Sequence, residues 1–186
     1  AHQEFKSMMV GLNNYRISQA LRVNPVIHRD LITDFWKNVS INKLGANRAG
    51  IVESMVKGTQ VIISEQIIWE VLEFGDASVF PIAYFVDRVP EVLEKMCYEG
   101  HYLPTIKKLL PAYLRFLAHS FVSCISKRKG GSDKISQTVT SAIVALAMDW
   151  DYNFSNFVFE EMKSNLLGKK KHLFFYVPRS LQMIFN

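Results

Sequence analysis

The sequence predicts an α+β fold that is mainly α, with about seven helices packed in one domain and a single β-hairpin near residues 51–63. Apolar residues recur at helical spacing through most of the chain, which favours helices. Two β-rich runs flank Lys57-Gly58, which favours one hairpin. A length of 186 residues suits a single domain spanning residues 1–186.

The N-terminal part contains two helical patterns. Residues 3–12 predict a short helix, and residues 16–23 predict an extended segment that Asn24-Pro25 ends. Residues 26–39 predict a longer helix, because its apolar side chains share one face. These side chains are Ile27, Leu31, Ile32, Phe35 and Trp36. Residues 40–50 predict a loop.

The clearest local pattern is a hairpin followed by a capped helix. Residues 51–64 predict the hairpin, with Lys57-Gly58 as its turn. Ser64 is suited to cap the helix that follows, Glu65 to its first turn, and Gly75 to the position beyond its end. Residues 1–75 therefore form a candidate N-terminal subdomain.

The rest of the chain predicts helices separated by turn residues. Pro90 suits the first turn of a helix ending at Gly100, and Pro111 begins a helix to residue 126. Further helices are predicted over residues 134–148 and 155–167, the second capped by Ser155. A last short helix begins at Pro178.

Positive charge is concentrated in the second half. Residues 1–100 carry 10 Lys and Arg against 12 Asp and Glu, whereas residues 101–186 carry 12 against 5. Two clusters contain six of those 12 basic residues, and each lies in a predicted turn between helices. They are candidate nucleic-acid-binding sites through phosphate contacts, with solvated loops as the alternative. The clusters are Lys127, Arg128 and Lys129, and Lys169, Lys170 and Lys171.

The sequence contains no recognisable reaction centre. No spacing of His and Cys matches a metal site, and no glycine-rich phosphate loop is present, so no metal or cofactor is predicted. Asp149 and Asp151 suit capping better than acid–base chemistry. His119 and Cys124 point apart on one helix, which argues against a nucleophile–base pair.

Cysteine use and hydropathy bear on location. Cys97 and Cys124 fall on apolar helix faces and predict buried free thiols in a reducing compartment. No run of 18 apolar residues and no leader pattern is present, so we expect no membrane contact and an intracellular protein, cytoplasmic or nuclear.

A group of aromatic residues near the C-terminus exceeds what one small core needs and predicts a partner interface. Its members are Phe157, Phe159, Phe174, Phe175 and Tyr176.

Several ordered segments resemble the polyproteins of plant copia-type retrotransposons, especially those of daisy-family genomes. TSAIVALAMDWDYNFSNFVFEEMKSNL, residues 140–166, is similar to their "ASAIICLA…FNFSKLIFDGM…NL". VPRSLQMIFN is similar to "YPRFLQLFLN", and ALRVNPVIHRDLITDFWKNV to "ALTVNPTIY…IEQFW". VKGTQVIISEQII is similar to "VDGK.V.I.E..V". AYLRFLAHSFVSCIS lacks the Trp of the family's "QWKFLIHTILHCLS", and the Lys-rich turn differs from its usual polar one.

The resemblance implies an accessory, envelope-like or gag-like region of a retroelement, with no catalytic residues to carry over. We therefore expect a non-enzymatic domain that acts by protein–protein association or self-association, with RNA or DNA as a further candidate partner. Two alternatives stay open: a host-adopted module that binds a small molecule or peptide, and an unrecognised enzyme.

Overall fold

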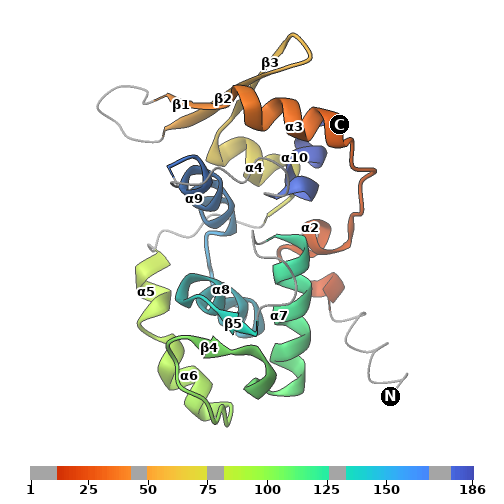
Figure 1. The fold of residues 1–186 in the computed structure, drawn as a ribbon. Coiled ribbons are helices and arrows are strands. Elements are labelled where there is room, and N and C mark those ends of the chain that lie inside the picture. Colours follow the sequence, from red (N-terminus) through yellow and green to blue (C-terminus); the bar gives the residue numbers. More distant parts are fainter. Residues whose placement is uncertain (1–11, 43–49, 75–81, 126–132, 168–176) are drawn as a thin grey trace.

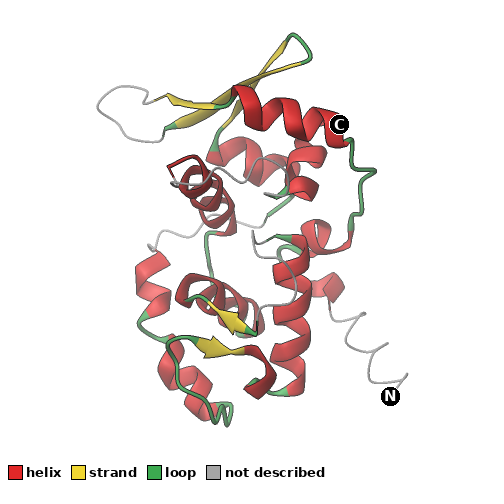
Figure 2. Ribbon diagram, viewed as in Figure 1, coloured by secondary structure: helices red, strands yellow, loops and turns green. Residues whose placement is uncertain are grey.

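The computed structural model describes residues 12–42, 50–74, 82–125, 133–167 and 177–186, and its fold is α+β and mainly α, as expected (Figures 1 and 2). The N-terminal elements are η1 (Leu12–Asn14), α2 (Ser18–Arg22), α3 (Arg29–Asn38), β1 (Ser40–Asn42), β2 (Ile51–Val56), β3 (Thr59–Ile63) and α4 (Glu65–Val71). The others are α5 (Ile82–Val86), α6 (Val89–Lys95), β4 (Thr105–Ile106), η2 (Lys107–Leu109), α7 (Ala112–Cys124), β5 (Lys134–Ile135), α8 (Gln137–Ala147), α9 (Phe154–Leu167) and α10 (Pro178–Phe185).

The elements gather into two regions, seen at the top and bottom of Figure 1. The sheet region contains β1–β3, α3, α4, α9 and α10, and the helical region contains α5–α8, β4 and β5. One continuous hydrophobic core includes residues of both regions. The predicted subdomain of residues 1–75 stays a prediction, but its α3 and α4 pack against the C-terminal α10, and α4 also packs against α9.

The predicted hairpin is confirmed as β2 and β3, paired antiparallel. Its turn residues Lys57 and Gly58 have φ angles of 48° and 82°, the positive pair that a two-residue turn matching strand twist requires. Ser40–Asn42 adds a third strand against β2, where a loop was expected. A further two-stranded ladder, β4 with β5, lies in the helical region. Short polar strands of this kind carry too little periodicity to be recognised alone.

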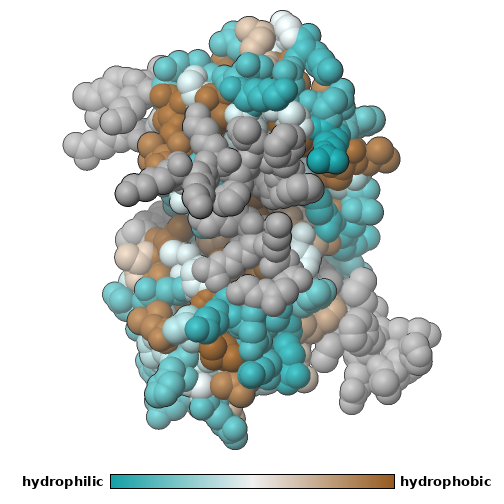
Figure 3. All heavy atoms as spheres, viewed as in Figure 1, coloured by the Kyte–Doolittle hydropathy of each residue, from teal (hydrophilic) through white to brown (hydrophobic). Residues whose placement is uncertain are grey.

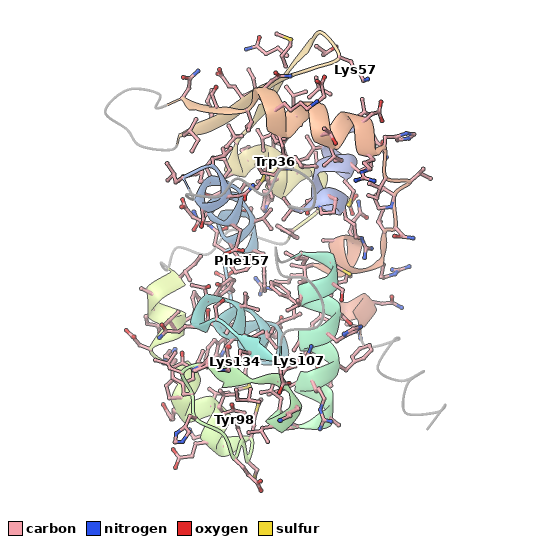
Figure 4. The ribbon with its side chains drawn as sticks, in the orientation of Figure 1. Trp36, Lys57, Tyr98, Lys107, Lys134 and Phe157 are labelled. Atoms are coloured by element: carbon pink, nitrogen blue, oxygen red, sulfur yellow. The ribbon has the colours of Figure 1, made fainter. Side chains whose placement is uncertain are left out.

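Helix α3 is shorter than predicted. It begins at Arg29 rather than residue 26, and Ile27 is 41% exposed instead of buried. Ile32, Phe35 and Trp36 do enter the core, with Trp36 at the centre of the sheet region in Figure 4. Residues 18–22 form α2 where an extended segment was expected, and the predicted helix 3–12 lies almost entirely outside the described residues.

The helix starts are partly as predicted. Ser64 caps α4 by accepting a hydrogen bond from the Ile67 amide at 3.2 Å. The cap of α9 is Asn153 rather than Ser155: the Asn153 carboxamide oxygen accepts from the Asn156 amide, and Ser155 is buried in the first turn. Helix α8 begins after the cap Ser136, because Lys134 and Ile135 are paired with β4 instead of opening the helix.

The two cysteines differ from the prediction. Cys97 is exposed, since α6 ends at Lys95 and Cys97 adopts a φ of 58° in the turn beyond. Cys124 is half-buried at the end of α7.

The C-terminal helix α10, which begins at Pro178 as predicted, fixes the linker between α2 and α3. The Arg179 guanidinium donates to the Val23 carbonyl and, at 2.7 Å, to the Cys124 sulfur. The buried Gln182 side chain accepts from the His28 amide at 2.9 Å. Two segments far apart in sequence are thereby joined.

Candidate nucleic-acid interface

Both basic clusters predicted from the sequence lie outside the described residues, which omit 126–132 and 168–176. The first cluster is Lys127, Arg128 and Lys129, and the second is Lys169, Lys170 and Lys171. The described residue that follows the first cluster is Asp133, at the start of the β4–β5 ladder. The geometry of that ladder therefore bears on the first cluster.

The β4–β5 ladder is held by a hydrogen-bonded tyrosine. The Tyr98 hydroxyl accepts from the Ile106 amide at 2.8 Å and donates to the His101 carbonyl at 3.1 Å. A Cβ at Gly100 would lie 2.4 Å from the Tyr98 hydroxyl oxygen, so a side chain there would displace this ring. The buried Thr105 hydroxyl donates to the Tyr102 carbonyl at 2.9 Å. The ladder is thus a constrained platform.

This platform brings together lysines that are distant in sequence. Ile106 pairs with Lys134, so the backbones of Lys107 and Lys134 are diagonal neighbours across the ladder, and the two residues are labelled near each other in the view of Figure 4. The Asp133 carbonyl accepts from the Lys107 amide at 2.7 Å, and its carboxylate accepts from the Lys108 amide at 3.0 Å. The two backbones are therefore locked in this arrangement.

An arginine from α7 extends the group. The Arg115 guanidinium donates to the Leu110 carbonyl at 3.2 Å, at the end of η2. We call Lys107, Lys108, Arg115 and Lys134 the β4–β5 basic cluster. Lys108, Arg115 and Lys134 are exposed and Lys107 is half-buried. The Asp133 carboxylate lies 3.7 Å from the Lys108 ammonium.

Sequence reasoning missed this cluster for two reasons. Lys134 was assigned to a helix, and Lys107-Lys108 lies in a segment without strong periodicity. The Lys-Lys pair was the one available signal, but its proximity to Lys134 depends on pairing across 28 residues.

The other candidates from the sequence have structural partners. Arg16 pairs with Asp149 at 3.6 Å and with Asp151 at 2.9 Å, and the Asp149 side chain is 80% exposed. Burial raises the pKa of the Cys124 thiol and the adjacent Arg179 lowers it, with a net increase. A reactive thiolate requires a lowered pKa, so Cys124 lacks this property of a nucleophile.

The predicted aromatic interface is also partly structural. Phe157 and Phe159 are each 2% exposed and belong to the core, while residues 174–176 lie outside the described part of the chain. Within the described ranges, no three His, Cys, Asp or Glu side chains are grouped to hold a metal ion. No described helix is long and apolar enough to cross a membrane.

Comparison with protein-family models, curated proteins and solved structures finds no match to this chain.

Proposed function

We propose that this chain is a non-enzymatic interaction domain that associates with a protein partner or with itself and contacts nucleic acid through basic side chains of the helical region. The observation that carries the nucleic-acid part is the β4–β5 basic cluster. It joins four cations from three elements, and the Asp133 carboxylate lies 3.7 Å from the Lys108 ammonium. Cations held on a rigid platform suit contacts with phosphates, which are independent of sequence.

The position of the cluster adds support. The segment that carries Lys127, Arg128 and Lys129 ends a few residues before Lys134 in the sequence. Helix α8 starts directly after the ladder, and the N-terminal end of a helix favours anions. Residues 127–129, Lys134 and the N-terminal end of α8 therefore follow one another along the sequence, and each favours an anion.

A retroelement origin is part of the proposal, and the resemblance of several ordered segments supports it. Two of these segments, VPRSLQMIFN and ALRVNPVIHRD, contact each other through Arg179 with Val23 and Gln182 with His28.

The nucleic-acid part is tested by fluorescence anisotropy with a labelled 20-nucleotide RNA and its DNA equivalent, from 50 to 300 mM salt. Replacing Lys107, Lys108 and Lys134 by Ala should weaken binding at least about tenfold and reduce the salt slope by about two to three. A second variant carries Ala at residues 127–129. The matched control replaces Lys37, Lys57 and Lys163, which lie in the sheet region.

No salt-sensitive binding of the unaltered domain at 50 mM salt would overturn the nucleic-acid part, as would equal losses in the cluster and control variants. The association part is tested by size-exclusion chromatography with light scattering, with and without the RNA. A strict monomer that ignores RNA would contradict self-association and the nucleic-acid part.

A further inference from the structure

The two edges of the three-stranded sheet differ in how they are covered. The described strands have the order β1-β2-β3, so β1 and β3 lie at the edges. Strand β1 has three residues and packs against α9, and next to it the Asn38 carboxamide donates to the Met55 carbonyl of β2 at 2.9 Å. Short strands and covering elements of this kind protect the edges of natural sheets. The β1 side is therefore protected.

Strand β3 carries none of these protections. Its five residues, Thr59–Ile63, include no charged residue and no proline, and four of them are β-branched. Thr59, Gln60 and Ile62 are exposed, and Val61 is half-buried. A strand of this composition at an open edge favours pairing with another strand. The composition of β3 therefore suits an interface better than a solvated edge.

The hairpin geometry fixes which backbone groups of β3 point outward. Val56 and Thr59 flank a two-residue turn, so they form the closing hydrogen-bonded pair of the ladder. Such pairs alternate along an antiparallel ladder, so Val61 also bonds to β2, whereas the amides and carbonyls of Gln60 and Ile62 point away from it. Within the described ranges, no other element hydrogen-bonds to these outward groups. The open edge thus presents donors and acceptors that an extended strand can satisfy.

We propose that β3 pairs antiparallel with β3 of a second copy of this chain, joining two three-stranded sheets into one. In the register centred on Val61, Gln60 of each copy faces Ile62 of the other, and each such pair exchanges two backbone hydrogen bonds. A register shifted by one step would pair β3 residues with the turn residue Gly58 or with Ser64. The hairpin lies at the end of the molecule away from the helical region (Figure 1), so that region stays clear of the pair.

The side chains of β3 complement one another in this register. Val61 lies opposite Val61 of the second copy, in a non-hydrogen-bonded pair of two β-branched residues, and Thr59 lies opposite Ile63. On the outer face, the two copies of Ile62, each 43% exposed in the single chain, become diagonal neighbours. No charged side chains are placed opposite each other, since the strand carries none. This site rests on the self-association part of the proposed function and gives it a location.

Disulfide trapping tests the register. In a Cys97→Ser, Cys124→Ser background, Val61→Cys should form an intermolecular disulfide under mild oxidation, because the two Cα atoms would lie about 4.5 Å apart. Thr59→Cys is the matched control: Thr59 is on the same face and more exposed, but its two copies would lie about 14 Å apart. Random collision would trap Thr59→Cys at least as readily, whereas the paired edge should trap Val61→Cys at least about tenfold faster.

A proline tests the hydrogen bonds themselves. Ile62→Pro removes an outward amide and keeps the bonds to β2, so the association constant measured by light scattering from about 5 to 500 µM should fall at least about tenfold. Ile62→Thr keeps the amide and the β-branch and should retain most of the association. Circular dichroism checks that each variant is folded. Since one strand pair covers less than the roughly 1,200 Å² of a stable interface, the dimer should dissociate on dilution.

The outcomes separate the edge from the proposed function. Equal trapping of Val61→Cys and Thr59→Cys, or association that Ile62→Pro leaves unchanged, would overturn the edge as the interface while retaining self-association. A strict monomer at every concentration would overturn the edge and self-association together. Neither result bears on nucleic-acid binding, which the anisotropy experiment tests independently.

Discussion

The sheet region and helix α8 of the helical region satisfy their buried and half-buried polar side chains in different ways. In the sheet region, partners come from distant parts of the chain: the Glu65 carboxylate accepts from the carboxamides of Asn153 and Asn156 at 2.7 and 2.8 Å, and Gln182 accepts from His28. In α8 of the helical region, the buried hydroxyls of Thr140 and Ser141 donate to carbonyls one turn earlier.

This difference indicates where function is to be sought. Polar side chains of the sheet region are occupied in fixing the C-terminal helices onto the N-terminal elements. In the helical region, α7, α5 and α6 pack on α8, and Lys108, Arg115 and Lys134 are exposed. On the face drawn in Figure 3, hydrophilic and hydrophobic side chains are interspersed, and hydrophobic groups protrude at the linker between α2 and α3.

The largest effect should come from the side chain that joins the two regions. Phe121 in α7 is fully buried, and its ring lies 5.4 Å from Phe157 and 6.2 Å from Phe154 of α9. Phe121→Ala should lower the free energy of unfolding by about 3–5 kcal/mol. Urea denaturation followed by circular dichroism and tryptophan fluorescence should give coincident transitions, because both regions share one core.

Tyr113→Ala is the control for that experiment, as Tyr113 lies on the same helix and is 40% exposed, so its loss should stay near about 0.5 kcal/mol. Separate transitions for the two probes would show that the regions are independent domains.

A second substitution tests the rigidity of the β4–β5 platform. Gly100→Ala should cost about 1–3 kcal/mol, since the new methyl group would displace the Tyr98 hydroxyl that holds Ile106. Gly50→Ala in the sheet region is the matched control, because its Cβ would meet neighbouring atoms at an ordinary 3.5 Å. Thermal unfolding measures both variants, and equal losses would contradict the role given to Tyr98.

The distant polar contacts of the sheet region should contribute less individually. Glu65→Gln should cost about 1 kcal/mol, because the new amide group cannot accept from one of the two asparagines. Glu70→Gln, on the exposed side of the same helix, should stay within about 0.5 kcal/mol. Chemical denaturation of the two variants compares them, and a Glu65 effect no larger than the control would remove the contrast between the regions.

The smallest effect concerns the two thiols. Cys97 should react with Ellman's reagent at pH 7.5 at least about tenfold faster than Cys124, because Cys97 is exposed and the pKa of the half-buried Cys124 is raised. Single variants Cys97→Ser and Cys124→Ser assign the two rates. Faster reaction of Cys124 would show that the Arg179 contact, and not burial, governs its thiol.

The same pKa shift predicts a pH dependence. The pKa of the Cys124 thiol is higher in the folded state than in the unfolded state. The contribution of this thiol to the free energy of unfolding is therefore fully present below about pH 8.5 and is lost as the pH rises through the folded-state pKa. Replacing Cys124 by Ala should therefore reduce the loss of stability at alkaline pH. Unfolding curves at pH 7 and pH 10 measure this difference.

The parts that the sequence predicted well depend on short-range physics. The turn Lys57-Gly58, the Ser64 cap and the start at Pro178 each follow from conformational preferences of residues within a few positions. The errors were at element ends, such as Ile27 and Lys134, where pairing with a distant segment or its absence outweighed the local pattern.

By itself, the sequence determined the fold class, the hairpin, most helices and the uneven distribution of charge, since these depend on periodicity and composition. Only the tertiary structure decided that the backbones of Lys134 and Lys107 are neighbours and that Asp149 and Asp151 pair with Arg16. Each of these depends on contacts between residues far apart in the chain, and such contacts are fixed by the packing of the whole core and not by local pattern.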